Sequence, residues 1–415
     1  MSRQVPGVRG VRALLPADAR MWTAVESCAR TLFAGYGYQE IRLPLLEHTE
    51  LYTRAVGEVT DIVEKEMYTF VDRNGDSLSL RPEGTAGCVR AGIEAGAFHN
   101  QTQRFWYQGP MFRHERPQKG RYRQFHQLGV EAYGMAGPDI EAEMILLGER
   151  LWRALGVKTR LLVNSLGTPA CRAAYRQALV DYLARHAADL DDDSRRRLER
   201  NPLRILDSKN PALADLLDAA PKLADYWSGE AVAHFQGLTD QLTEAGVAFT
   251  VTPRLVRGLD YYTHTVFEWV SDALGAQATV CAGGRYDGLV EELGGAATPA
   301  VGFALGLERL VTLVTRWPQT APLDVFVITG TPTRRKAVAL AEALREHGFA
   351  VEVYLGPAGV KSQIKRAQSS GARMTLYAQG DEIELDGAGA AGARVAWSEA
   401  VLAVVARLRG QREGE

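Results

Sequence analysis

The stretch from Phe112 to Gln127, FRHERPQKGRYRQFHQ, constrains the fold of this chain more than any other. It sets one acid, Glu115, among five cationic side chains, those of Arg113, Arg116, Lys119, Arg121 and Arg123. A surface helix would spread such charges among apolar residues, whereas Pro117 and Gly120 break this run. Because the flanks RFWYQGPMF and QFHQLGVEAYG are strand-like, the sequence predicts two strands joined by a long basic loop.

Such a hairpin suits a polyanionic ligand. The planar guanidinium of arginine donates two parallel hydrogen bonds to a phosphate, so these arginines could reach over a bound phosphate chain. The alternative is an ordinary surface hairpin with solvated charges.

Size and composition describe a globular protein. A chain of 415 residues allows roughly two or three domains around a large buried core. Its 46% hydrophobic and 24% charged residues are typical of soluble proteins. The formal net charge is -2, so any contact with a nucleic acid must come from local patches.

Membrane and metal signals are missing from the sequence. The first 20 residues have no apolar core of signal-peptide length, and no segment is apolar for long enough to cross a bilayer. We therefore expect a cytoplasmic protein with no membrane partner. The four cysteines are far apart and the histidines form no HExxH group, so we expect neither a disulfide framework nor a protein-ligated metal.

The pattern of apolar and polar residues divides the chain into three regions. Residues 1–168 and 249–318 mix helices and strands, including a helix over 22–36, a strand over 38–47, a hairpin over 64–84, and helices over 85–95 and 139–155. They are interrupted at 169–248 by helices rich in Ala, Leu and Arg, which we interpret as an inserted helical module. Beyond Trp317 and a linker, strands alternate with helices, which predicts a small, largely parallel α/β domain over 323–415.

The candidate functional residues are mainly Arg, Gly and acidic residues, which recur near the ends of predicted strands. They are found in Arg81–Thr85, the basic hairpin, Glu131, Arg257–Tyr262, Gly283–Gly288 and Gly302–Arg309. There is no GxSxG, P-loop or kinase motif. This inventory suits a reaction whose nucleophile comes with the substrate, such as a carboxylate that attacks the α-phosphate of ATP. Each piece also has a plainer interpretation: a surface ion pair at Arg257, a turn at Gly283-Gly284, a helix-end pair at Glu308-Arg309.

Taken together and in their order along the chain, these motifs resemble those of the class II aminoacyl-tRNA synthetases, and among them the histidyl-tRNA synthetases. The resemblance covers nearly the whole chain. The basic hairpin and the terminal GFALGLERL are common to the class, while LVRGLDYYTHTVFE and AGGRYDGL are specific to the histidine enzymes. It implies an α+β catalytic domain with an antiparallel sheet flanked by helices, a helical insertion, and a C-terminal α/β anticodon-binding domain.

The resemblance also implies an ATP site. Arg113 and Arg309 would hold the α- and γ-phosphates, assisted by Arg121 and Arg123. Glu115 would meet the adenine amino group and Phe125 would stack on the ring. Mg2+ would accompany the β- and γ-phosphates.

For the amino acid, the resemblance implies that Glu83, Thr85 and Gln127 surround the α-amino group. Glu131 and Tyr262 would face the imidazole, with Tyr261 alongside. A carboxylate opposite a ring N–H would form a charge-assisted hydrogen bond, and would be left unpaired by other amino acids. Arg257 would reach the reacting α-phosphate, so Arg257 and Arg113 are the predicted catalytic residues.

Further partners follow from the same resemblance. Arg116, Gln118 and Lys119 at the hairpin tip would contact the acceptor stem of tRNA(His). The first motif, around Tyr36–Glu47, would form a homodimer contact. The cations Lys361, Lys365 and Arg366 would face the anticodon arm, although a solvated helix is the alternative. The stretch DGAGAAGAR departs from the family pattern, where we would expect a more ordered strand.

One rival belongs to another class of protein. The regulatory subunit of ATP phosphoribosyltransferase shares the catalytic fold and binds histidine without activating it. The full set Arg113, Arg121, Arg257 and Arg309, together with a C-terminal domain, speaks against that interpretation.

Overall fold

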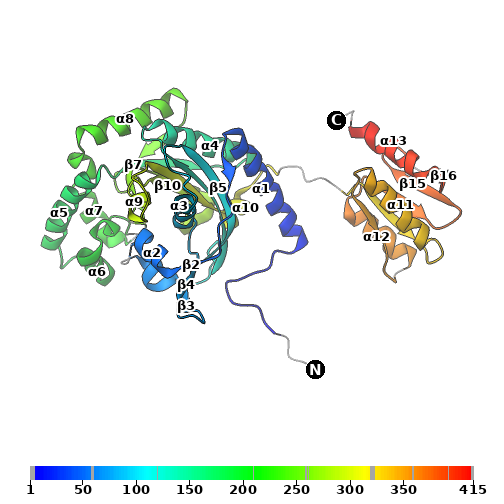
Figure 1. Ribbon diagram of the computed structural model, residues 1–415, viewed down its shortest axis with the longest axis horizontal. Coiled ribbons are helices and arrows are strands. Elements are labelled where there is room, and N and C mark those ends of the chain that lie inside the picture. Colours follow the sequence, from blue (N-terminus) through cyan, green and yellow to red (C-terminus); the bar gives the residue numbers. More distant parts are fainter. Residues whose placement is uncertain are drawn as a thin grey trace. The chain divides into compact units, whose positions relative to one another are not determined.

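The structure is a computed structural model that describes residues 5–57, 60–118, 120–208, 210–257, 259, 261–317, 323–357, 359–390 and 392–412. Lys119, and Gly258 and Asp260 of the LVRGLDYY stretch, lie outside this part. The chain forms two compact units, Met1–Pro318 and Gln319–Glu415 (Figure 1).

A large sheet forms the centre of the first unit, with the strand order β1-β5-β6-β11-β10-β9-β7-β8. Its strands are β1 (Gln39–Glu40), β5 (Gln103–Phe112), β6 (Gln124–Tyr133), β7 (Arg160–Ser165), β8 (Phe249–Val251), β9 (Thr263–Val270), β10 (Thr279–Arg285) and β11 (Ala300–Gly306). Neighbours from β5 to β7 are antiparallel, while the short edge strands β1 and β8 pair in parallel. The predicted antiparallel sheet is therefore confirmed.

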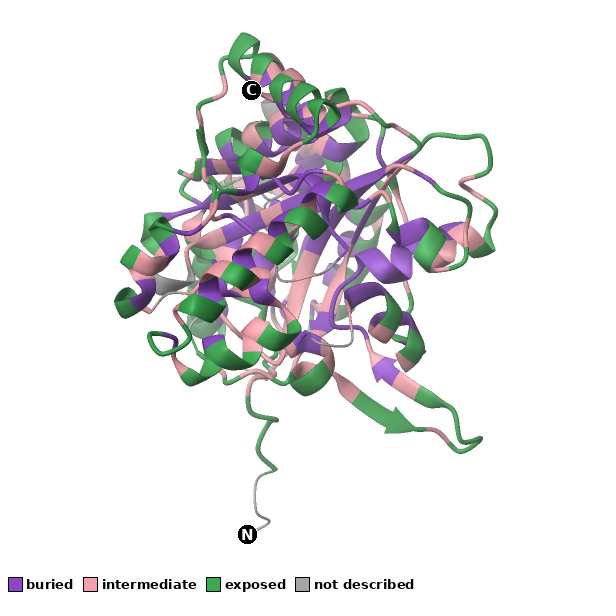
Figure 2. Cartoon of the chain, turned by 90° about the vertical axis from the view of Figure 1, so that its left-hand side faces the viewer, coloured by how far each residue is buried: buried purple, intermediate pink, exposed green. Residues whose placement is uncertain are grey.

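Helices cover both faces of this sheet. One face packs against α1 (Pro16–Gly35), α4 (Asp139–Leu155), α8 (Gly229–Glu244) and α10 (Leu307–Leu313), and the other against α2 (Thr49–Val56), α3 (Thr85–Glu94) and α9 (Leu289–Glu292). Figure 2 shows the buried residues concentrated on the strands and on inward helix faces. The helix predicted over 139–155 has those bounds.

A smaller sheet, β2-β4-β3, carries the hairpin that the sequence predicts over 64–84. Its strands are β2 (Leu46–His48), β3 (Tyr68–Val71) and β4 (Ser77–Leu80), and a π-helical turn, η1 (Ile62–Glu66), precedes β3. The single strand expected over 38–47 is wrong, because β1 ends at Glu40 and β2 begins at Leu46. Pro44 lies between them and has no N–H to continue a ladder.

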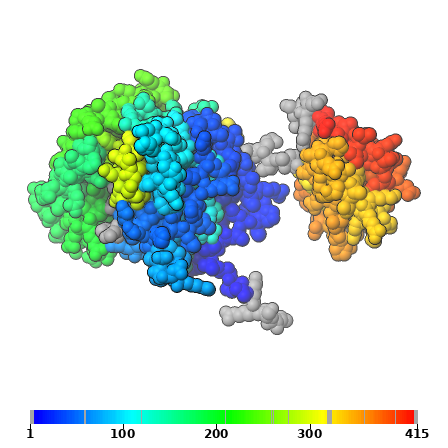
Figure 3. Space-filling model, in the orientation of Figure 1, coloured from blue at the N-terminus to red at the C-terminus, as the bar shows by residue number. Residues whose placement is uncertain are grey.

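The stretch 169–248 contains α5 (Pro169–Arg185), α6 (Asp192–Arg200), α7 (Ala214–Asp218), α8 and the 3-10 turns η2 (Pro202–Ile205), η3 (Pro211–Leu213) and η4 (Leu223–Tyr226). Side chains of Thr168, Asp191 and Ser228 accept backbone N–H groups at the starts of α5, α6 and α8. In Figure 3 these residues, in green, form one flank of the first unit.

The second unit is a sheet of order β13-β12-β14-β15-β16 with helices α11 (Arg334–Glu346), α12 (Val360–Ser370) and α13 (Ala400–Arg412). Strands β12 (Val325–Thr329), β13 (Val351–Val353) and β14 (Met374–Ala378) are parallel, while β15 (Glu382–Gly387) and β16 (Ala393–Ala396) are antiparallel. The stretch DGAGAAGAR, which we expected in place of a more ordered strand, lies between β15 and β16 and includes one end of each. The stretch spans a hairpin turn, with Gly387 and Gly389 at positive φ and a strand on each side.

None of the described helices is long and apolar enough to cross a membrane.

Candidate active site

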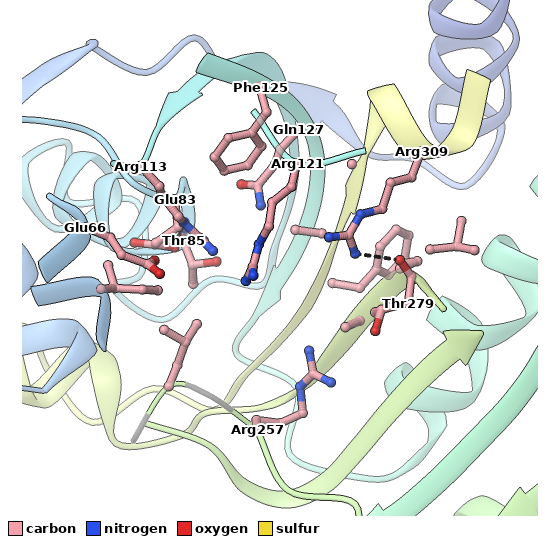
Figure 4. Close-up of a pocket in the computed structure, with 18 of the residues that line it drawn as sticks. Glu66, Glu83, Thr85, Arg113, Arg121, Phe125, Gln127, Arg257, Thr279 and Arg309 are labelled. Atoms are coloured by element: carbon pink, nitrogen blue, oxygen red, sulfur yellow. Dashed lines mark hydrogen bonds between the residues drawn. The ribbon is translucent and has the colours of Figure 1, made fainter. Parts of the chain in front are cut away.

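A cavity of about 350 Å³ lies over strands β5, β6, β10 and β11 of the large sheet. Most of the predicted ATP- and histidine-binding residues line it: Glu83, Thr85, Arg113, Glu115, Arg121, Phe125, Gln127, Arg257, Tyr261, Tyr262 and Arg309. In Figure 4, Arg113, Glu83 and Thr85 lie on one side and Arg309 on the other, while Arg121 and Arg257 extend toward the space between them. Folding thus brings together segments that are more than two hundred positions apart in the sequence, such as those of Glu83 and Arg309.

The alternation of strand β6 puts its functional side chains on one face. Phe125, Gln127 and Glu131 point to the cavity side, whereas Leu128 and Val130 join the core on the opposite face. At Gly129 a Cβ atom would lie 2.1 Å from the Tyr107 ring, so this glycine makes room for a tyrosine that also lines the cavity. The oxygen of the Gln127 amide is buried and has no hydrogen-bond partner among the described residues.

The basic side of the cavity is built from the hairpin and from α10. The Arg113 Nε donates to the Pro82 carbonyl at 2.8 Å, and its guanidinium lies 5.2 Å from the centre of the Phe125 ring. Arg309 donates to the carbonyl oxygens of Gly120 at 3.1 Å and Thr279 at 2.9 Å, which ties the hairpin tip to β10.

Acidic side chains lie among the cations on this side. Arg121 forms an ion pair with Glu115. Burial, together with the nearby Arg121, lowers the pKa of Arg309, yet a guanidinium remains charged at neutral pH. An added anion would therefore meet preoriented cations in a partly desolvated space.

Arg257 enters the cavity from the segment before β9. Its Nη1 donates to Glu268 Oε2 at 2.8 Å, and the arginine side chain is 18% exposed. Burial acts to lower the pKa of Arg257, but the charges of Glu268 and other neighbours together outweigh it and raise that pKa. The buried Nε of Arg257 has no hydrogen-bond partner among the described residues. Such a donor, beside a cavity, can donate a hydrogen bond to an oxygen of a ligand.

Glu83 and Thr85 belong to the start of helix α3. The Glu83 carboxylate accepts the backbone N–H of Thr85 at 2.6 Å and of Ala86 at 3.0 Å, where the helix dipole favours a negative charge. Burial nevertheless raises the pKa of Glu83. The carboxylate is thus fixed at the cavity wall.

Glu131 is 1% exposed and is absent from the residues that line the cavity. Its carboxylate accepts the hydroxyls of Thr85 at 2.7 Å and Tyr107 at 3.1 Å, and that of Tyr286. Burial raises the pKa of Glu131 to about 8. Thr85, Tyr107 and Tyr286, which line the cavity, are therefore each hydrogen-bonded to the Glu131 carboxylate. Direct contact between Glu131 and an imidazole stays a prediction.

Other predicted residues lie outside the cavity. Arg123 donates its backbone N–H to the Gly10 carbonyl at 2.8 Å and is not among the lining residues. Arg116 and Gln118 are exposed near the hairpin tip, where the backbones of Gln118 and Arg121 pair. Lys119 lies outside the described residues, so the structure adds nothing to its predicted role.

Comparison with known proteins identifies the fold and family. A family model described as "Histidyl-tRNA synthetase" matches residues 10–310. The structure of apo histidyl-tRNA synthetase from S. aureus is 33% identical, with a TM-score of 0.80 over 97% of this chain and 100% of that one. The chain belongs to the histidyl-tRNA synthetase family.

Two more distant structures show the same fold. A Bacillus halodurans protein described as "ATP phosphoribosyltransferase regulatory subunit/histidyl-tRNA synthetase" is 24% identical, with a TM-score of 0.67 over 92% of this chain and 100% of that one. Histidyl-tRNA synthetase from Nostoc sp. PCC 7120 is 18% identical, with a TM-score of 0.68 over 98% of this chain and 100% of that one. The fold predicted from the sequence, a class II catalytic unit followed by an α/β unit, is confirmed.

Several residues of the cavity had no role predicted for them, although Tyr286 belongs to the AGGRYDGL stretch. Tyr107 and Tyr286 line it together with Tyr261 and Tyr262, as do Asp61, Glu66 and Arg204. Tyr107 could have been found, because it faces Gly129 across the β5–β6 ladder and so shares the face of Gln127. Arg204 carries no such signal, since it belongs to η2 in the helical stretch.

The stretch Gly283–Gly288 also contains a residue with a structural role, Arg285. Arg285 is fully buried, forms a two-pronged ion pair with Glu141 at 2.6 and 2.8 Å, and also pairs with Asp287 at 3.0 Å. His234 of α8 contacts the same Glu141 at 2.7 Å. This arginine therefore ties the sheet to α4 and α8, while its neighbour Tyr286 faces the cavity.

Proposed function

We propose that this chain is a histidine–tRNA ligase. In the first step the carboxylate oxygen of L-histidine attacks the α-phosphorus of ATP, and the bond to the β-phosphate breaks to release pyrophosphate. In the second step a hydroxyl of the terminal ribose of tRNA(His) attacks the carbonyl carbon of histidyl-AMP, and AMP leaves. The substrate carboxylate is itself the nucleophile, so the first step needs no protein base.

The observation that supports this proposal best is the composition of one cavity. It combines guanidinium groups from three separate segments, those of Arg113, Arg121, Arg257 and Arg309, with an end walled by tyrosines. Fixed cations stabilise charge that builds on the phosphoryl oxygens, and they do so without a change of protonation. The tyrosine end offers hydroxyls backed by Glu131, which suits a ring that both donates and accepts hydrogen bonds.

We assign the residues as the family resemblance implies. Arg113 and Arg309 bind the phosphates and Phe125 carries the adenine, with Arg121, Arg123 and Glu115 assisting. Glu83, Thr85 and Gln127 hold the α-amino group, and the unpaired Gln127 oxygen supports this role. Arg257 bridges the reacting carboxylate and the α-phosphate.

Mg2+ enters this reaction with ATP. Among the described residues no three His, Cys, Asp or Glu side chains are grouped to share a metal ion. The cavity is lined by guanidinium, tyrosine and separate carboxylate groups, and it fits an ion carried by phosphate oxygens, which Mg2+ prefers. It would there neutralise charge on the β- and γ-phosphates.

The proposal includes two further partners. Arg116, Gln118 and Lys119 contact the acceptor stem, and residues 323–415 bind the anticodon arm, with residues 169–248 as an inserted module. A homodimer forms around Tyr36–Glu47. The exposed apolar side chains of Leu45, Leu46, Phe70 and Val71 on or beside the small sheet support that contact. Light scattering would measure the oligomeric state.

The experiment that tests the activity is ATP–pyrophosphate exchange with each standard amino acid in turn, followed by aminoacylation of tRNA(His). We expect exchange with histidine alone. Binding of histidine without exchange would overturn the proposal and support the rival regulatory subunit. Exchange driven by another amino acid would retain the class and overturn the substrate.

A further inference from the structure

The tyrosines at the histidine end of the cavity depend on one another. The rings of Tyr261 and Tyr262 lie 4.7 Å apart, and Tyr261 lies 5.5 Å from the ring of Tyr286. The Tyr262 ring packs over Gly284, where a Cβ atom would be 2.9 Å from the ring. The shape of this end therefore depends on where the backbone of Tyr262 is held.

That backbone is held from the helical stretch 169–248. The Nη1 atom of Arg172, in the first turn of α5, donates to the Tyr262 carbonyl oxygen at 2.7 Å. Arg172 does not line the cavity. It reaches the back of the tyrosine segment, while the rings of that segment face the substrate side.

The start of α5 is itself fixed relative to β9. The N–H of Leu166 donates to the His264 carbonyl at 2.6 Å, and the N–H of His264 donates to the Gly167 carbonyl at 2.9 Å. Thr168 then caps α5 by accepting the N–H of Cys171 at 3.2 Å. The donor and the acceptor of the Arg172–Tyr262 hydrogen bond therefore belong to segments that are bonded to each other. The bond can thus hold the Tyr262 backbone in a fixed position.

The segment also needs such a restraint. His264, two residues after Tyr262, has a φ of 45°, in the left-handed region that a residue with a Cβ adopts at a cost. A strained backbone keeps its conformation only when surrounding contacts enforce it.

We propose that Arg172 is a positioning residue for histidine recognition, which acts by holding the Tyr261–Tyr262 backbone in the conformation that the amino acid requires. This inference rests on the proposed function, since it assigns the tyrosine end to the amino acid. The helical stretch then shapes the amino-acid site of the same chain, besides any contact that it makes with tRNA.

The test compares L-histidine binding by titration calorimetry, and KM values in exchange, for wild type, Arg172→Ala and Arg172→Lys. For Arg172→Ala we expect the Kd and KM for histidine to rise roughly tenfold, as for one lost charge-assisted hydrogen bond. The KM for ATP should stay within about twofold, because the phosphate side is held by other segments. Arg172→Lys should recover part of the affinity, because an ammonium can donate to the same carbonyl.

Arg176→Ala is the matched control, an exposed arginine one turn further along the same helix. It should bind histidine as wild type does. If Arg172→Ala does not fold, Arg172→Gln replaces it with the same expectation. Equal losses for histidine and ATP, or unchanged histidine affinity, would overturn the proposal. A wild type that binds histidine but catalyses no exchange would sink the proposed function, yet the binding comparison would still decide the role of Arg172.

Discussion

Replacing Arg257 by alanine should slow histidine activation by two or more orders of magnitude. A unit charge about 4 Å from a developing phosphoryl charge is worth about 4 kcal/mol at the effective dielectric of a partly buried site. Arg257, at 18% exposure, is such a site, but one of its nitrogens is already engaged by Glu268 at 2.8 Å. We therefore expect a loss of roughly 3 kcal/mol of transition-state stabilisation, in the range measured for single donors of this kind.

The assay is ATP–pyrophosphate exchange at saturating ATP and histidine, with thermal unfolding measured in parallel. Arg254→Ala is the matched control, because Arg254 lies in the same segment but pairs with Asp218 at 2.7 Å and does not line the cavity. Removal of Arg257 also leaves Glu268, 13% exposed, without its cation. Glu268→Gln separates that effect, since it removes the pairing charge and keeps Arg257. Exchange by Arg257→Ala within a few-fold of wild type would refute the reasoning.

Two other predictions concern the buried acid and the hairpin tip. Burial raises the pKa of Glu131 from its ordinary value to about 8, so between these values the folded state holds a proton that the unfolded state has released, and stability falls as pH rises. Glu131→Gln should thus unfold at a higher temperature than wild type at pH 9 and at a similar one at pH 5; equal differences at both pH values would contradict the shift. Arg116 is exposed, away from the cavity lining, so Arg116→Ala combined with Lys119→Ala should spare exchange and slow aminoacylation of tRNA by roughly tenfold. Equal loss in both assays would count against that division of roles.

The residues on regular strands were the easiest to predict. Phe125, Gln127 and Glu131 occupy alternate positions of β6, and the hairpin flanks have the apolar pattern of strands. Arg113 and Arg309 were predicted from motifs at strand ends, and the structure places both at the cavity. A strand fixes which side each residue faces, while the roles of these residues were predicted from the family resemblance.

Residues whose position depends on tertiary packing could not be predicted in this way. The strand expected over 38–47 divides between two sheets at Pro44, and the Gly/Ala stretch near 386–394 proved to span the turn of a hairpin. Glu131 is close to the cavity, but three hydroxyls from β5, α3 and the end of β10 surround it. Arg172 holds the backbone of Tyr262 and Arg204 lines the cavity, both from helical segments whose docking no local periodicity encodes.

The most direct test of the central claim is a single-turnover experiment with protein in excess over α-labelled ATP, in the presence of pyrophosphatase and L-histidine. If ordered guanidinium groups allow the amino-acid carboxylate to attack the α-phosphorus, labelled histidyl-AMP should accumulate in an amount that matches the ATP added, and none should form with other amino acids. Protein that binds histidine and ATP together and yields no adenylate would contradict the account.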